Sequence, residues 1–190
     1  MPSFEHTVLL TDRLRLRPST EADAEALFAI YSDTRVSRFL SRPAWTDMEV
    51  AHARIARDRE ALPSGKYLGL VMERKADGQV VGECSLFNLV VQCRRAEIGY
   101  SLGSSAQGQG LMHEALTALL TYGFADMHLN RVEADIDPRN TASAKSLERL
   151  GFQNEGHLRE RWIVDGEVSD TGLYGLLARD WALLRAPTTA

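Results

Sequence analysis

The sequence has few cysteines and no long apolar run. Its two cysteines, Cys84 and Cys93, form no CxxC pair, so neither a disulfide framework nor a cysteine metal site is indicated, and a reduced, cytoplasmic setting is expected. The longest apolar stretches, such as residues 67–72, fall far short of the roughly 20 residues that cross a bilayer. The first residues show no basic segment followed by an apolar one. We therefore expect neither a signal peptide nor a membrane partner.

The sequence also lacks an excess of positive charge, internal repeats and low-complexity segments. Lys and Arg number 22 against 26 Asp and Glu, a net charge of −4, so nothing indicates the basic face of a nucleic-acid binder. Hydrophobic residues make up 44% and charged residues 25%, which are ordinary values for a globular protein. This composition over 190 residues predicts a single domain at residues 1–186, with a loose tail at residues 187–190.

What the sequence does contain is a succession of strand and helix patterns. Asp77-Gly78 and Asp165-Gly166 are typical of hairpin turns, and the capping box at Thr46–Glu49 predicts a helix start. The order of the elements predicts a mixed α/β fold with a largely antiparallel sheet. The expected strands are residues 14–17, 67–74, 80–91, 97–103, 131–136, 153–164 and 167–177. The expected helices are residues 22–31, 46–62, 111–127 and 142–150.

The segment of residues 98–115 reads as strand, glycine-bearing loop and helix. A helix start exposes unpaired N–H groups, and glycines let the backbone close on a phosphate. A triphosphatase loop would need Lys and Ser or Thr where Leu111 and Met112 stand, and the dinucleotide fingerprint lacks its third glycine after Gly110. A loop for the pyrophosphate of coenzyme A and a plain glycine turn remain open.

A second strand-to-helix junction lies at residues 137–152, where Asn140 or Thr141 can cap the helix. A cap alone is the simpler interpretation of Asn140. Two polar helix starts after neighbouring strands, however, create one cleft at the strand ends, which is where ligands commonly bind in α/β proteins.

Together these segments resemble the GNAT superfamily of acetyl-CoA-dependent N-acetyltransferases, and within it the RimJ/RimL group of ribosomal-protein N-terminal acetyltransferases. The resemblance covers almost the whole chain, from residue 10 to Trp181, and rests on the order and spacing of its motifs. It implies a mixed, mostly antiparallel central sheet that is flanked by helices and splayed between its two central strands. The motifs are Ala96-Glu97-Ile98-Gly99-Tyr100, residues 107–116, Asn130-Arg131-Val132, Asn140 with Ser143, Leu150-Gly151-Phe152, Glu155-Gly156, and Asp165-Gly166 followed by Asp170.

The resemblance also implies acetyl-CoA as co-substrate. Backbone N–H groups of the glycine loop would bind the pyrophosphate, the strand before it would pair with the pantetheine arm, and the second junction would lie near the thioester sulfur. Met112 stands where the superfamily has a small residue, so its side chain must point away from the pyrophosphate. The expected cofactor-binding residues are Leu102, Gln107, Gly108, Gln109, Gly110, Leu111, Met112, Asn140 and Ser143.

The chemistry implied by the resemblance is direct attack of a neutral amine on the thioester. Glu97 and Glu160 are alternative general bases, and Ser143 matches the position that protonates the leaving thiolate. Trp162 and Asp170 are expected to line the acceptor groove. The five histidines show no metal-ligand spacing, so no metal is expected.

The resemblance makes a protein N-terminus, such as that of a ribosomal protein, the first expectation for the acceptor. A small amine such as a polyamine, an amino acid or an antibiotic is the alternative, and a coenzyme A-binding module without catalysis is a third. A homodimer is a further possibility for the assembly.

Overall fold

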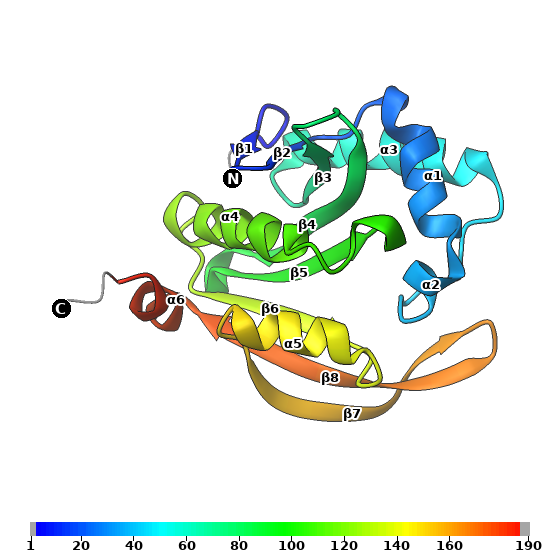
Figure 1. Ribbon diagram of the computed structural model, residues 1–190. Helices are drawn as coiled ribbons and strands as arrows, with labels where there is room; N and C mark the ends of the chain where they lie inside the picture. Colours follow the sequence, from blue (N-terminus) through cyan, green and yellow to red (C-terminus); the bar gives the residue numbers. More distant parts are fainter. Residues whose placement is uncertain (1–2, 187–190) are drawn as a thin grey trace.

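The computed structural model describes residues 3–186, which form an eight-stranded sheet with the strand order β1-β2-β3-β4-β5-β6-β8-β7 (Figure 1). The strands are β1 (Leu9–Leu10), β2 (Leu14–Arg17), β3 (Leu68–Arg74), β4 (Val80–Val90), β5 (Arg95–Leu102), β6 (Arg131–Ile136), β7 (Gln153–Val164) and β8 (Glu167–Leu177). The helices are α1 (Ala24–Ser32), α2 (Thr34–Ser37), α3 (Met48–Ala61), α4 (Leu111–Ala125), α5 (Thr141–Arg149) and α6 (Ala178–Arg185).

Neighbouring strands are antiparallel except for β5 and β6, which lie side by side in the middle of the sheet and run parallel. Their pairing covers only residues 95–97 against residues 131–133. Both strands continue, to Leu102 and Ile136, without pairing beyond Glu97 and Glu133. The predicted mixed fold and its central splay are therefore confirmed, and the splay leaves backbone groups of β5 and β6 available to a ligand.

Helices cover both faces of the sheet because successive strand residues point to opposite sides. Leu70 and Met72 of β3 join the main core with α4 and α5, whereas Val71 between them joins a second core with α1 and α3. Figure 1 shows α4 beside β4 and β5 and α5 beside β6 and β8, on either side of the splay. Both helix starts, at Leu111 and Thr141, are thereby brought to the same region of the molecule.

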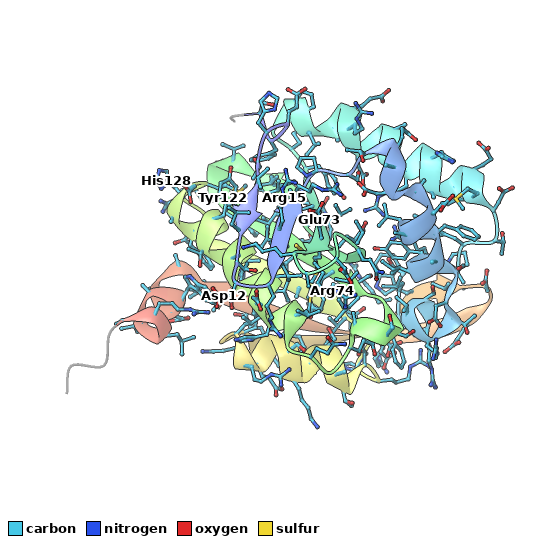
Figure 2. The ribbon with its side chains drawn as sticks, turned by 45° about the horizontal axis from the view of Figure 1, so that its top comes forward. Asp12, Arg15, Glu73, Arg74, Tyr122 and His128 are labelled. Atoms are coloured by element: carbon cyan, nitrogen blue, oxygen red, sulfur yellow. The ribbon has the colours of Figure 1, made fainter. Side chains whose placement is uncertain are left out.

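Ion pairs join side chains of neighbouring elements. Figure 2 shows Arg15 of β2 beside Glu73 of β3, and the Arg15 Nη1 lies 3.7 Å from the Glu73 Oε1. In α3, Arg54 has only 9% of its side chain exposed and contacts the carboxylates of Asp58 and Glu83. Its Nη2 also donates to the Tyr67 hydroxyl at 3.0 Å. Arg54 is therefore a buried charge that two carboxylates balance.

Replacement of Arg54 by Met should lower the free energy of unfolding by about 3–5 kcal/mol, because it leaves Glu83 without its cation and Asp58 with only the exposed Arg57. Chemical denaturation measures the loss. The exposed Arg57→Met variant is the matched control, since 67% of the Arg57 side chain is exposed and such surface pairs contribute about 0–1 kcal/mol. Equal losses for the two variants would contradict this role for Arg54.

Some details of the chain differ from the sequence-based expectation. The cap of α3 is Asp47, whose carboxylate accepts from the Glu49 N–H at 3.0 Å, so the capping box predicted to start at Thr46 is wrong by one residue. The short elements β1 and α2 and the last helix, α6, were not expected because each is too short for a clear periodicity. The predicted tail, residues 187–190, lies outside the described residues, and the single-domain prediction stays a prediction. No helix within residues 3–186 is long and apolar enough to span a membrane.

Candidate active site

The glycine loop between β5 and α4 is held by a side chain from the other end of the chain. Arg13 donates from Nη1 to the Gln109 carbonyl at 2.8 Å, and its Nε lies 2.6 Å from the Glu114 Oε2. Gly108 and Gly110 both have φ of +76°, a conformation that strongly favours glycine. A Cβ at Gly108 would meet nothing within 4 Å, so the space in front of this turn is empty of protein.

Backbone N–H groups at the start of α4 have no partners in the molecule. The first helical hydrogen bond runs from the Glu114 N–H to the Gly110 carbonyl at 3.1 Å. Among residues 3–186, no acceptor is found for the N–H groups of residues 108–112. A run of free N–H groups at the positive end of a helix is suited to a phosphate or pyrophosphate.

A groove of about 1310 Å³ leads from this loop along α4 and α5. Most of the expected cofactor-binding residues line it, whereas Leu111 is buried in the core and the Gln109 carbonyl faces Arg13. For these two residues only the backbone N–H is available. The Met112 side chain packs partly against the core. The expected cofactor-binding residues that line the groove are Leu102, Gln107, Gly108, Gly110, Met112, Asn140 and Ser143.

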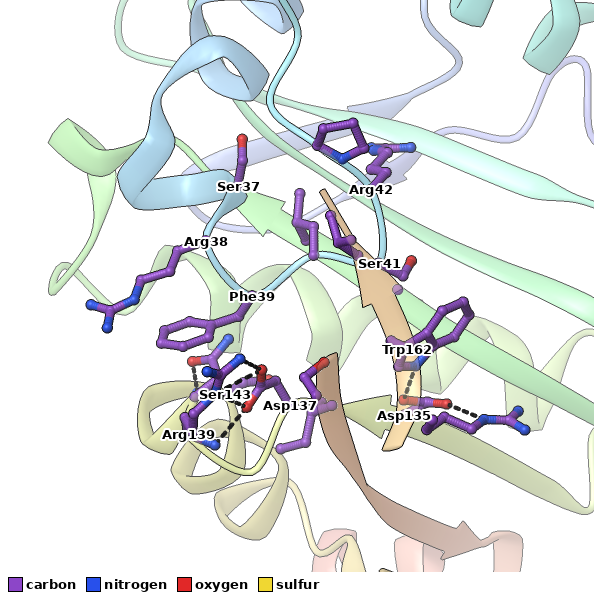
Figure 3. Close-up of a pocket in the computed structure, with 18 of the residues that line it drawn as sticks. Ser37, Arg38, Phe39, Ser41, Arg42, Asp135, Asp137, Arg139, Ser143 and Trp162 are labelled. Carbon is purple, nitrogen blue, oxygen red and sulfur yellow. Dashed lines mark hydrogen bonds and ion pairs between the residues drawn. The ribbon is translucent and has the colours of Figure 1, made fainter. Parts of the chain in front are cut away.

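A second pocket, of about 590 Å³, adjoins the groove (Figure 3). It lies among the α2 loop, the splayed ends of β5 and β6, and the tip of the β7–β8 hairpin. The residues lining both cavities are Phe39, Leu40, Tyr100, Asn140 and Ser143. The two cavities therefore meet at this set of residues, so a ligand in one can react there with a ligand in the other.

Tyr100 and Ser143 form a hydrogen-bonded pair at this junction. Their hydroxyl oxygens are 2.7 Å apart, and burial raises the pKa of Tyr100 to about 12, although the bond to Ser143 opposes the shift. The Ser143 N–H donates to the Asn140 Oδ1 at 3.1 Å, so Asn140 does cap α5. The Tyr100 hydroxyl keeps its proton at neutral pH and can support a second hydroxyl that loses or shares one.

Glu97 lines the second pocket, and within residues 3–186 its carboxylate makes no hydrogen bond or ion pair. It stands in register with Glu133 of β6, but that carboxylate is occupied by Arg95 and Arg131. Glu160 is placed differently: it is exposed, has φ of +51° and does not line either cavity. Of the two expected bases, only Glu97 lines a cavity, the second pocket.

The two expected acceptor residues separate in the structure. Trp162 lines the second pocket, whereas Asp170 lies outside it and accepts from the Glu160 N–H at 2.8 Å and pairs with His157. Asp170 thus holds a bulge in β7, where Leu158 pairs with Thr171 but Trp162 already pairs with Ser169. The bulge turns Trp162 toward the pocket.

Asp135 takes a place in the pocket that the sequence did not indicate. Its Oδ1 accepts from the buried Thr171 hydroxyl at 2.9 Å and from the Trp162 Nε1 at 3.4 Å, as Figure 3 shows for the indole. Arg161 lies 3.8 Å from its other oxygen. Because these contacts fix the carboxylate without fully enclosing it, Asp135 can receive a cationic group from the pocket.

Both arginines and carboxylates line the second pocket. Arg139 is bonded to Asp137 and Glu167, and it holds the pKa of Asp137 below its usual range. The Arg139 guanidinium also lies 5.9 Å from the Phe39 ring centroid. Because Asp137 and Glu167 are paired with Arg139, the carboxylates that can attract an ammonium in the pocket are Glu97, Asp135 and Asp165. Within residues 3–186 no group of His, Cys, Asp and Glu is arranged to hold a metal.

Comparison with known proteins finds relatives that match most of this chain. A family profile described as an acetyltransferase (GNAT) domain matches residues 13–153. The chain is 37% identical to the uncharacterised N-acetyltransferase p20 of Bacillus licheniformis, over 92% of this chain and 98% of that protein. It is 32% identical to the [ribosomal protein uS5]-alanine N-acetyltransferase of Escherichia coli, over 91% of this chain and 92% of that enzyme. Mycobacterium smegmatis RimJ in complex with CoA-disulfide has a TM-score of 0.83 and 28% identity, with 94% of this chain and 91% of that chain covered.

Proposed function

Because the chain belongs to the acetyltransferase (GNAT) family, we propose that it transfers the acetyl group of acetyl-CoA to the α-amino group of a protein N-terminus. The observation that carries the proposal is that the groove and the second pocket, which we call the acceptor pocket, meet at Tyr100 and Ser143. The likeness to an alanine N-acetyltransferase of a ribosomal protein supports the choice of acceptor. When bound, acetyl-CoA supplies the thioester carbonyl that the amine attacks.

The residues of the groove fit this co-substrate. The free N–H groups of residues 108–112 bind the pyrophosphate, and the left-handed turn at Gly108 leaves it room. The unpaired stretch of β5, ending at Leu102, offers backbone groups to the amides of the pantetheine arm. Asn140 uses its Oδ1 to cap α5, and its NH₂ remains for the same arm.

Residues of the second pocket and of its junction with the groove transfer the protons. Glu97 accepts the proton that the acceptor's ammonium loses, directly or through a water molecule. Ser143, supported by the Tyr100 hydroxyl at 2.7 Å, donates a hydrogen bond or proton to the leaving sulfur. Asp135 and Glu97 hold the cationic form of the acceptor in the pocket before it reacts.

The acceptor class predicts the pH dependence. An α-amino group with a pKa of about 7.7–8 is roughly 10–20% neutral at pH 7, whereas a lysine amine is under about 0.1% neutral. Since only the neutral amine attacks, kcat/KM for an N-terminal peptide should rise about tenfold per pH unit below pH 7 and level off above about pH 8. Steady-state rates across pH 6–10 measure this. A rate that keeps rising to pH 10 would indicate a lysine-type amine instead.

A thiol-release assay with acetyl-CoA tests the proposal. Peptides beginning with Ala, Ser, Thr or Met are compared with polyamines, amino acids and aminoglycosides. Turnover of a peptide that stops when its N-terminus is pre-acetylated supports the proposal. Turnover of small amines alone would replace it with small-molecule acetylation, and coenzyme A binding without turnover of any acceptor would point to a binding module.

A further inference from the structure

Positively charged side chains without carboxylate partners line the far part of the groove. Lys145 and Arg149 come from α5, and Arg185 comes from the last turn of α6. Within residues 3–186, no Asp or Glu oxygen lies within 4.0 Å of the charged nitrogens of these three residues. Lys145 lies two residues beyond Ser143 and Arg149 six, about 3 and 9 Å along the helix, so the cations extend from near the reacting junction toward the far end of the groove.

Neutral groups hold these side chains in position. Arg185 donates from Nη2 to the Thr117 hydroxyl of α4 at 3.0 Å, and its guanidinium lies 4.4 Å from the Trp181 ring centroid. Arg149 donates to the Ser146 hydroxyl at 3.3 Å. Lys145 lies four residues before Arg149, hence on the same face of α5. Their full charge is therefore available to a ligand in the groove.

The charges converge on one spot at the start of α4. His113, which lines the groove, has its pKa lowered by burial and by the positive charges of Arg149 and Arg185. Its Nδ1 is buried without a hydrogen-bond partner among residues 3–186. Two guanidinium groups from different helices thus act on the same imidazole. Of the acidic residues that line the groove, Glu114 is paired with Arg13, and neither it nor Asp12 forms an ion pair with Arg149 or Arg185 within residues 3–186.

This group of cations is distinct from the anion site of the glycine loop. The free N–H groups of residues 108–112 suit one phosphate-bearing group, whereas the three cations offer charged side chains to another. Coenzyme A has two such groups, the pyrophosphate and the monoester phosphate on the ribose 3′ oxygen. A phosphate monoester carries about −1.5 to −2 charges at pH 7, which matches a cluster of several cations.

We propose that Lys145, Arg149 and Arg185 bind the 3′-phosphate of coenzyme A, so that this chain distinguishes the coenzyme from its 3′-dephospho form. The inference rests on the proposed function, since it assumes that coenzyme A occupies the groove. The three cations of the outer groove would then select coenzyme A over its 3′-dephospho form, which the glycine loop alone would not do.

Isothermal titration calorimetry with coenzyme A and 3′-dephospho-coenzyme A tests the inference. The wild-type chain should bind coenzyme A about 10–100-fold more tightly, because charge-assisted hydrogen bonds to a phosphate are strong. Arg149→Ala should weaken coenzyme A binding by about tenfold and leave the Kd of the dephospho form within about twofold. The ratio of the two constants should therefore fall in the variant.

Arg179→Ala is the matched control, because Arg179 lies on α6 like Arg185 but is 80% exposed and lines neither cavity. It should leave the ratio unchanged. Equal Kd values for the two ligands in the wild-type chain would overturn the inference while leaving the proposed function in place. An Arg149→Ala variant that weakens both ligands equally would also overturn it. Failure of the wild-type chain to bind either ligand would remove the proposed function itself.

Inorganic phosphate and adenosine 3′,5′-bisphosphate identify the source of the phosphate. The bisphosphate should compete with coenzyme A, and Arg149→Ala should weaken that competition. Inorganic phosphate should compete only weakly, because it lacks the groove contacts of the nucleotide. Equal competition by the two would show a general anion site and contradict selection of the coenzyme.

Discussion

Substitution of Glu97 by Gln should lower kcat by about 10²–10³-fold, the size typical of a lost general base. Glu97 lines the acceptor pocket and, within residues 3–186, its carboxylate has no cation or donor to hold it. The amide of Gln has nearly the same shape but cannot take a proton from the ammonium. Steady-state kinetics with a saturating peptide, together with the Kd of coenzyme A from calorimetry, measure the effect. The Kd should change by less than about twofold.

Glu133→Gln provides the control for this substitution. Glu133 stands opposite Glu97 in the parallel pairing of β5 and β6 but lines neither cavity. Its replacement should leave kcat within about twofold once the melting temperature confirms a folded protein. A Glu97→Gln enzyme with normal kcat would remove Glu97 as the base, and the search would move to a water molecule or to Asp135.

Substitution of Gly110 by Val should weaken coenzyme A binding by about 100-fold or more. Gly110 has φ of +76°, which a β-branched residue adopts only at a large cost. A Cβ there would also lie 3.6 Å from the Arg13 Nη2, beside the free N–H groups of the loop. The strain at this φ therefore distorts the loop whose N–H groups bind the pyrophosphate, and the added side chain contacts Arg13. Calorimetric titration with coenzyme A measures the loss.

Gly78→Val is the control variant, because it introduces the same backbone strain away from the coenzyme A groove. Gly78 also has a positive φ, +71°, and its Cβ would meet nothing within 4 Å, but it lies in the β3–β4 turn and lines neither cavity. It should lower the melting temperature while leaving the Kd of coenzyme A unchanged. If Gly110→Val bound the coenzyme as tightly as Gly78→Val, the loop would not be the pyrophosphate site.

The sequence was most informative where the site is local in the chain. The glycine loop could be predicted because strand, turn and helix follow one another within residues 98–115, and Gly108 and Gly110 are needed by the backbone itself. The α5 cap at Asn140 could be predicted for the same reason, since its partner, the Ser143 N–H, is three residues away.

Parts of the site that depend on tertiary contacts could not be predicted in this way. Tyr100 ends the motif of residues 96–100, yet its partner Ser143 is 43 residues away in the sequence. Only the packing of α5 beside β5 brings the two hydroxyl groups together. Asp135 becomes a pocket residue through Thr171 and Trp162 of the last hairpin. The β7 bulge, which separates Trp162 from Asp170, leaves no periodic signal in the sequence.

Acetylation of a single peptide that carries both a free α-amine and a lysine side chain tests the central claim most directly. The peptide is incubated with acetyl-CoA and the chain at pH 7, and fragmentation mass spectrometry locates the acetyl group. The account predicts acetyl on the α-amine, lost in the Glu97→Gln variant. Acetyl on the lysine side chain, or an unmodified peptide beside a small amine that is acetylated, would contradict it.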